Sequence, residues 1–167
     1  MHIYDESTSR RTIWSVQINW SRELTFSERQ IGFIAENVAE ARGVYCIYAK
    51  DRKFRFSSPD TRTDRWSRVI YVGSGWLNHR LCAHLTRRRN DLLAEYLDRY
   101  KLAFRCDRII DTDVIDWPRT VEAHLLREFE TKFGGLPCAN RRREAVPDLS
   151  LDLFILNQNH FNFLARG

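Results

Sequence analysis

The residues best suited to chemistry lie within the stretch VIYVGSGWLNHRL, residues 69–81, and just after it. Arg80 and His84 are four positions apart, so on a helix they share one face. A guanidinium fork matches the oxygens of a phosphate, and a neighbouring imidazole can hold a phosphate oxygen or move a proton. Tyr71 ends the β-branched run before them and is expected at a sheet edge, facing whatever binds there. Gly73 and Gly75 are expected to let the chain turn sharply and a ligand approach closely.

Hydrophobic periodicity predicts the elements that must position these groups. The predicted strands cover residues 13–20, 43–49, 68–73 and 101–110, and the predicted helices cover residues 28–41, 76–88, a segment after Asn90, and 117–133. Ser27 and Gln30 have the spacing of a capping box at the start of the first helix. The stretch LSLDLFILNQNHFNF fits a strand or a helix equally well.

Strands so close together in sequence favour antiparallel pairing over a parallel crossover sheet. The sequence therefore predicts an α+β fold, with a small antiparallel central β-sheet flanked by helices and a strand and helix added at the N-terminus. Residues 50–68 lie between two predicted strands and exceed what a tight hairpin needs, so they are expected to form a long functional loop.

Composition sets the class of protein. The 167 residues are 43% hydrophobic and 13% aromatic, which excludes a disordered chain and suits one domain with its own core. The four cysteines show no paired ligand spacing and are expected to be reduced thiols. No secretory leader or apolar run of 18 residues is apparent, so the expected location is cytoplasmic and no membrane partner is expected.

Basic residues are clustered beyond what the net charge of +5 requires. Residues 50–68 contain seven Lys or Arg against three acids, and two further runs contain three arginines each. Each run alone is also what a solvated surface would show, but three runs around one candidate site favour a polyanionic partner, nucleic acid. The predicted nucleic-acid-binding residues are Lys53, Arg55, Arg87, Arg88, Arg89, Arg141 and Arg142.

The stretch GVYCIY, which contains Tyr45, is followed by YVG, which contains Tyr71, and then by Arg80 and His84. In this order the motifs resemble the GIY-YIG endonuclease family. The family pattern continues with a glutamate on a helix, matched by EAHLLREF, and ends near an asparagine, matched by LPCAN. The resemblance implies one GIY-YIG-like domain over residues 1–167, with its core at about 43–141 and with 1–42 and 142–167 as additions packed on that core.

The resemblance also implies roles for individual residues. Tyr45 and Tyr71 match the motif tyrosines, one of which would activate or position the attacking water. Arg80 would stabilise the charged transition state, with His84 beside it at a position that is often His or Tyr in the family. The family's single glutamate binds a divalent cation, Mg²⁺ or Mn²⁺, and Asn140 would orient the site by hydrogen bonding.

Two glutamates compete for the metal position. Glu128 lies 12 residues before Asn140, which suits the usual family separation, whereas Glu122 lies 18 residues before it. Glu122 is followed by the Leu-Leu and aromatic pattern of the family helix, and it shares a side with the apolar stripe that faces the sheet. Glu128 projects about 120° away at 3.6 residues per turn. The sequence therefore favours Glu122 as the catalytic metal ligand.

The function implied by the resemblance is a divalent-metal-dependent endonuclease that hydrolyses DNA phosphodiester bonds, such as a restriction or defence nuclease. Double-stranded DNA is the expected partner. A catalytically inactive nucleic-acid-binding module on the same fold and an RNA-directed nuclease are the alternatives. The sequence leaves open whether the chain acts as a monomer or a homodimer.

Overall fold

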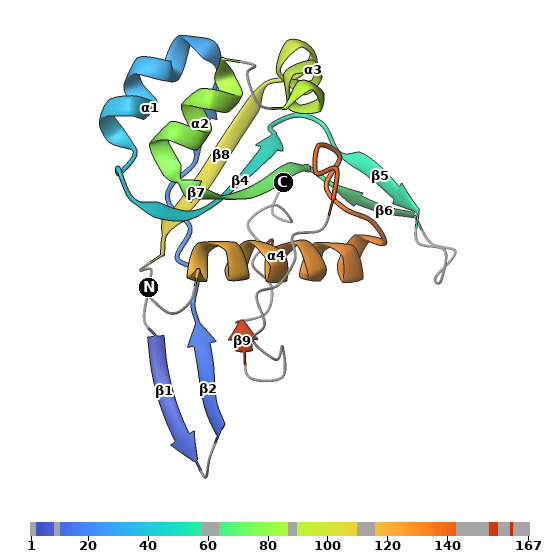
Figure 1. Ribbon diagram of the computed structural model, residues 1–167. Coiled ribbons are helices and arrows are strands. Elements are labelled where there is room, and N and C mark those ends of the chain that lie inside the picture. Colours follow the sequence, from blue (N-terminus) through green and yellow to red (C-terminus); the bar gives the residue numbers. More distant parts are fainter. Residues whose placement is uncertain are drawn as a thin grey trace.

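A central four-stranded antiparallel sheet organises the molecule, which is α+β (Figure 1). The computed structural model describes residues 3–8, 11–57, 64–86, 90–109, 116–142, 154–156 and 161. The strand order is β3 (Leu24–Phe26), β8 (Leu102–Arg108), β4 (Arg42–Ala49) and β7 (Val69–Trp76). The helices are α1 (Ile31–Asn37), α2 (Leu77–Leu85), α3 (Asp91–Arg99) and α4 (Trp117–Phe133). The predicted antiparallel sheet with flanking helices is thus confirmed.

The central strand β4 is buried on both faces, and its alternate residues enter two separate cores. Val44 and Cys46 pack in the core that α4 covers. Tyr45 and Ile47 pack on the opposite side, in the core formed with α1, α2 and α3. Both strand neighbours of β4 pair with it antiparallel, so every side chain on this ladder has a fixed side.

The strand β7 lies at the edge of the sheet, where a side chain completes its hydrogen bonding. The amide of Asn140 accepts a bond from the Val72 backbone N–H at 3.0 Å and donates one to the Val72 carbonyl at 2.8 Å. The N–H of Ala139 also donates to the Ile70 carbonyl. One side-chain amide thus takes the place of a peptide group on a neighbouring strand, and it occupies the edge of the sheet at Val72.

Removing the Asn140 amide should destabilise the protein markedly. Asn140→Ala leaves both polar groups of the buried Val72 backbone without these partners, at a cost of roughly 2–4 kcal/mol in the free energy of unfolding. Urea denaturation followed by circular dichroism measures the loss. Asn37→Ala is the matched control, because its amide makes a single exposed bond to the Phe33 carbonyl and should cost less than about 1 kcal/mol. Equal losses in the two variants would contradict this role of Asn140.

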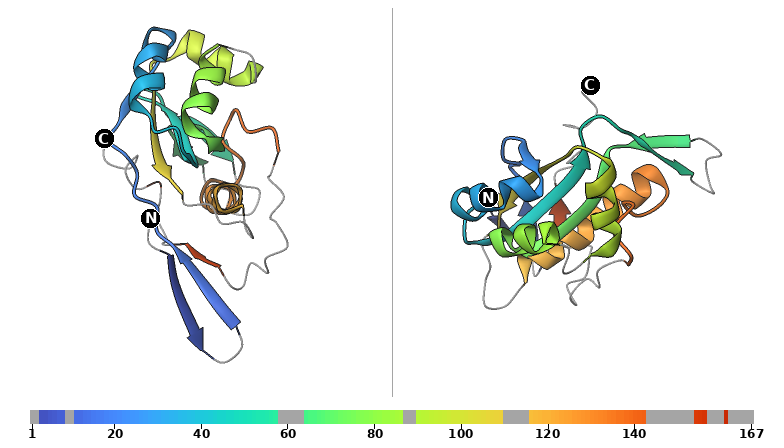
Figure 2. Two further views of the ribbon diagram at one scale, coloured as in Figure 1. Left: turned by 60° about the vertical axis from the view of Figure 1, so that its left-hand side comes forward. Right: turned by 90° about the horizontal axis from the view of Figure 1, so that it is seen from above.

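Two smaller sheets complete the fold. The strands β1 (Ile3–Thr8) and β2 (Arg11–Val16) form an antiparallel hairpin, and β2 pairs in parallel with β9 (Phe154–Leu156). This hairpin extends away from the central sheet beyond α4 (Figures 1 and 2). The strands β5 (Phe54–Ser57) and β6 (Asp64–Ser67) form a second hairpin. The segment before the region 43–141 therefore pairs with the segment after it, through the strands β2 and β9.

The segment 50–68 contains the paired strands β5 and β6, so the expectation of one long loop there is wrong. Phe54 packs edge-on against Tyr96 of α3 and against Tyr100, the residue that follows this helix, and Phe56 packs against two phenylalanines of α4. The alternation FRF places both phenylalanines on the side of the strand that packs against the protein. This pattern indicates a strand, but the many charged residues of the segment favoured the interpretation as a loop.

The N-terminal elements also differ from the predictions. The strand expected over residues 13–20 ends at Val16, because Ile18 turns into the core that α4 covers and the Ser21 N–H donates to the Cys106 carbonyl of β8. The helix expected over residues 28–41 begins as a 3₁₀ turn and ends at Asn37, where Val38 becomes extended and buried. Ser27 makes no side-chain cap bond, so the capping box does not form. The ambiguous C-terminal stretch contains the strand β9.

Candidate active site

The edge strand β7 is where predicted site residues from distant parts of the chain meet. They surround a cleft of about 220 Å³. Its lining residues are Tyr71, Arg80, Asn90, Glu122, Ala139, Asn140, Arg141 and Arg142. Because successive residues of β7 point to opposite faces, its edge is reached both by side chains on the α2 side and by side chains on the α4 side. Six predicted residues are therefore brought to one place.

Glu122 is held rigidly at this cleft. Its side chain is only 7% exposed, and a carboxylate oxygen accepts a 2.5 Å hydrogen bond from the hydroxyl of Ser74 on β7. The start of α4 is fixed by Asp116, whose carboxylate accepts from the Arg119 backbone N–H and pairs with Arg42 of β4 at 2.8 Å. The cap and the bond to Ser74 together fix where the carboxylate lies.

Arg80 folds back from α2 across the end of β7. Its Nε donates to the Ser74 carbonyl at 3.2 Å. Gly75 has a positive φ of 126°, and a Cβ there would lie 3.1 Å from that Nε. Glycine is required both for this backbone conformation and for the space that the arginine occupies. A guanidinium held through Nε still has its two terminal nitrogens with which to bind an anion.

Tyr45, Tyr71 and His84 form an aromatic cluster behind the cleft. The Tyr45 hydroxyl and His84 Nε2 are 2.8 Å apart, and the rings of Tyr71 and His84 are edge-on with centroids 5.0 Å apart. Tyr45 is 1% exposed and His84 is 4% exposed. Only Tyr71 of the three lines the cleft. Tyr45 and His84 were predicted as catalytic residues, but the structure puts them one layer deeper than the cleft wall.

Gly73 makes room for this cluster. A Cβ at this position would lie 2.6 Å from the Tyr45 hydroxyl and 2.7 Å from the ring of Tyr71. The strand continues through Gly73 to Trp76. The expectation that this glycine serves a sharp turn and a close ligand is therefore wrong, because the space belongs to two tyrosines.

The Tyr45 phenol keeps its proton at neutral pH. Burial, followed by the nearby Tyr71 and the negative charge of Glu122, raises the pKa of Tyr45 well above its usual value of 10, and Arg80 opposes this only in part. Tyr45 is thus poorly suited to remove a proton from water, and its hydroxyl instead fixes the orientation of the His84 ring.

Glu122 and Glu128 occupy different positions relative to the cleft. Glu128 is partly exposed, is absent from the cleft lining, and lies six residues along α4 from Glu122. At 1.5 Å per residue this separation is about 9 Å along the helix axis. Of the two, Glu122 is the one that faces Arg80 across the cleft.

The predicted basic residues divide into two groups. Arg141 and Arg142 line the cleft, and Arg141 lies 3.5 Å from Asp91. Lys53 and Arg55 belong to the β5–β6 region, where Arg55 pairs with Asp64 at 2.7 Å. Arg87, Arg88 and Arg89 lie outside the described residues.

The β5–β6 hairpin is some distance from the cleft. It packs on Phe129 and Phe133, which follow Glu122 on α4 by seven and eleven residues, or about 10 and 16 Å along the helix. Lys53 and Arg55 do not line the cleft. Any contact they make with a polyanion would be at a distance from Glu122.

Two polar residues of this region escaped the sequence analysis. Ser74 follows the YVG motif directly and faces α4, which its alternation with Gly73 could have indicated. Asn90 caps α3 by accepting from the Leu93 N–H, and its amide donates to the Ala139 carbonyl. Asn90 thereby holds the loop that carries Asn140.

The donor set for a metal ion is small. In the part of the chain that the structure describes, no three His, Cys, Asp or Glu side chains come together as ligands. Glu122 is the single carboxylate among the residues that line the cleft. A cation held here would need its other ligands from water and from a bound substrate.

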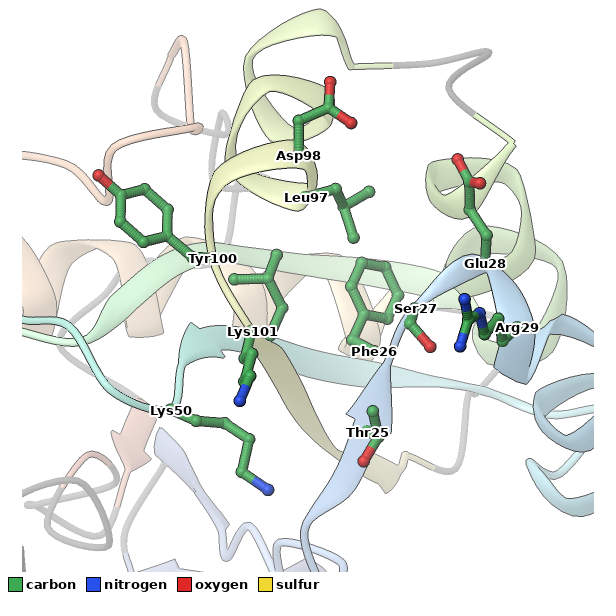
Figure 3. A pocket seen from close by; sticks show the side chains of 11 residues that line it. Thr25, Phe26, Ser27, Glu28, Arg29, Lys50, Leu97, Asp98, Tyr100 and Lys101 are labelled. Atoms are coloured by element: carbon green, nitrogen blue, oxygen red, sulfur yellow. The ribbon is translucent and has the colours of Figure 1, made fainter.

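A larger hollow of about 550 Å³ lies elsewhere, between β3 and the end of α3. Phe26, Leu97 and Leu102 form its apolar part, and its lining also includes two acidic and three basic side chains (Figure 3). Lys50 at its rim already pairs with Glu23 at 2.9 Å. None of the predicted site residues lines this hollow, so the smaller cleft remains the candidate site.

Comparisons with family models, curated proteins and solved structures found no match to this chain. Among the described residues, no helix has both the length and the apolar character that crossing a membrane requires.

Proposed function

We propose that this chain is a GIY-YIG-type endonuclease that uses Mg²⁺ or Mn²⁺ to hydrolyse phosphodiester bonds of DNA. One observation carries the proposal: Tyr71, Arg80 and Glu122, spread over 52 positions, line a single cleft of about 220 Å³. The antiparallel arrangement of β4, β7 and β8 with flanking helices is consistent with that family type. A phenol, a guanidinium and one carboxylate are the groups that phosphodiester hydrolysis would use.

Glu122 suits a hard divalent cation. Its carboxylate is buried, is held by Ser74, and is part of a cleft wide enough for water. Mg²⁺ commonly keeps several waters and takes one or two carboxylates together with phosphate oxygens. The residues present therefore fit such an ion, with Glu122 as its protein ligand. When bound there, the ion would draw negative charge from the scissile phosphate.

The remaining side chains would bind the phosphates of the substrate and position the attacking water. Arg80 would bind a non-bridging phosphate oxygen and stabilise the extra charge of the transition state. Tyr71 would orient the attacking water through its hydroxyl. Arg141 and Arg142 would contact neighbouring phosphates, which positions a nucleic acid without reading its sequence. Tyr45 and His84 support Tyr71 from behind.

Cleavage of supercoiled plasmid tests this function. We expect nicked and linear products with Mg²⁺ or Mn²⁺ and none with chelator, and faster cutting of duplex DNA than of RNA when the two compete. Preferred cutting of RNA would support the proposed hydrolysis of phosphodiester bonds but would make RNA, and not DNA, the substrate. If well-folded protein cuts neither DNA nor RNA with either metal, the proposal fails in favour of a binding module.

A further inference from the structure

A second groove adjoins the cleft on the other side of Arg80. It has a volume of about 540 Å³ and is lined by Arg42, Gly75, Trp76, His79 and Arg80. Arg80 lines both this groove and the cleft that contains Glu122. The two hollows therefore meet at Arg80, the side chain that we propose binds the scissile phosphate.

The indole of Trp76 is unusually open for a residue of its size. It is 51% exposed at the last position of β7, although tryptophan is on average a highly buried residue. It lies directly opposite Arg42 in the antiparallel ladder, so the two side chains share one face of the sheet. The groove is thus lined by one flat aromatic side chain and by basic side chains, and among the described residues its lining contains no carboxylate.

The charges of the groove suit an anionic strand more than an apolar partner. Arg42 is paired with Asp116, so part of the basic character is already balanced. Arg80 bonds only a carbonyl through its Nε among the bonds described for it. A guanidinium beside an exposed aromatic ring combines the two contacts by which proteins hold single-stranded nucleic acid: a cation for the phosphate and a ring on which a base stacks.

Resting on the proposed nuclease function, we propose that this groove binds an unpaired nucleotide next to the scissile phosphate, with its base stacked on Trp76. Bases within a duplex are already stacked on their neighbours and cannot present a face to the indole. The substrate class is therefore a strand with single-stranded character at the cut, such as a junction or a flap.

Binding measured without cleavage tests the inference separately from the nuclease. Fluorescence anisotropy of a labelled single-stranded oligonucleotide and of its duplex would be recorded in chelator, for the native protein, Trp76→Ala and Trp76→Phe. We expect Trp76→Ala to weaken single-strand binding roughly tenfold and Trp76→Phe to retain most of it, while duplex binding changes by less than about twofold.

Trp66 provides the matched control, because it is 54% exposed on β6 and does not line the groove. Trp66→Ala should bind both oligonucleotides as the native protein does. Equal losses in Trp66→Ala and Trp76→Ala, or no loss in Trp76→Ala, would overturn the inference even if the protein cuts DNA. A dimer in sedimentation that Trp76→Ala alone disrupts would also overturn it, since a second copy would then occupy the groove. If the protein cuts nothing but binds single strands in a way that depends on Trp76, the proposed role of the groove is supported and only the proposed nuclease activity is rejected.

Discussion

Glu122→Gln is expected to lower metal-dependent DNA cleavage by about 10³-fold or more. The substitution preserves the shape of the side chain and leaves an oxygen able to accept the bond from Ser74, but it removes the negative charge that would hold the cation. Initial rates of plasmid nicking at saturating Mg²⁺ measure the effect. A thermal melt should show little change, because the buried amide replaces the buried carboxylate without a change in volume.

Glu128→Gln is the matched control for this prediction. The residue is on the same helix, partly exposed and outside the cleft, so its rate should stay within about threefold of the native rate. Ser74→Ala should have an intermediate effect of about tenfold, because it removes one hydrogen bond to the carboxylate and leaves the charge in place. Loss of cleavage in Glu128→Gln with normal cleavage in Glu122→Gln would reverse the assignment of the metal ligand.

The sequence was sufficient to predict those parts of the fold that depend on periodicity. The apolar run over residues 43–49 predicted the central strand, and the apolar stripe of α4 predicted that Glu122 lies on the side of the helix that faces the sheet. Both signals are local, since each follows from the geometry of one element. The convergence of Tyr71 and Arg80 with Glu122 was expected only from the family resemblance, because the periodicity of single elements does not show which elements are neighbours.

Features that depend on contacts between distant segments were not predictable. The pairing of the Asn140 amide with Val72 joins positions 68 residues apart, and an asparagine in a loop gives no sign of its partner. Gly73 looked like a turn residue because the tyrosine that occupies its space is on another strand. The FRF alternation of β5 was local, but its charged neighbours suggested a solvated loop.

Arg80→Ala is expected to reduce cleavage by about 10²- to 10³-fold while leaving the fold intact. The side chain is partly exposed and bonds one backbone carbonyl, so its loss should cost little stability. The lost activity would reflect transition-state charge that the guanidinium no longer stabilises. Arg80→Lys keeps a positive charge but cannot hold the Ser74 carbonyl and a phosphate with one rigid fork, so we expect a loss of roughly tenfold or more. Single-turnover cleavage rates would order the three proteins.

Gly75 provides an independent test of how Arg80 is positioned. A methyl group at this position meets the arginine at 3.1 Å and strains a backbone with φ of 126°, so Gly75→Ala should displace the guanidinium and slow cleavage. If Gly75 acts through Arg80, adding Gly75→Ala to Arg80→Ala should lower the rate little further, because the group to be displaced is already absent. Multiplicative losses in the double variant would mean that Gly75 serves the site by another route. Full activity in Arg80→Ala would remove the guanidinium from the chemistry and leave it only a binding role.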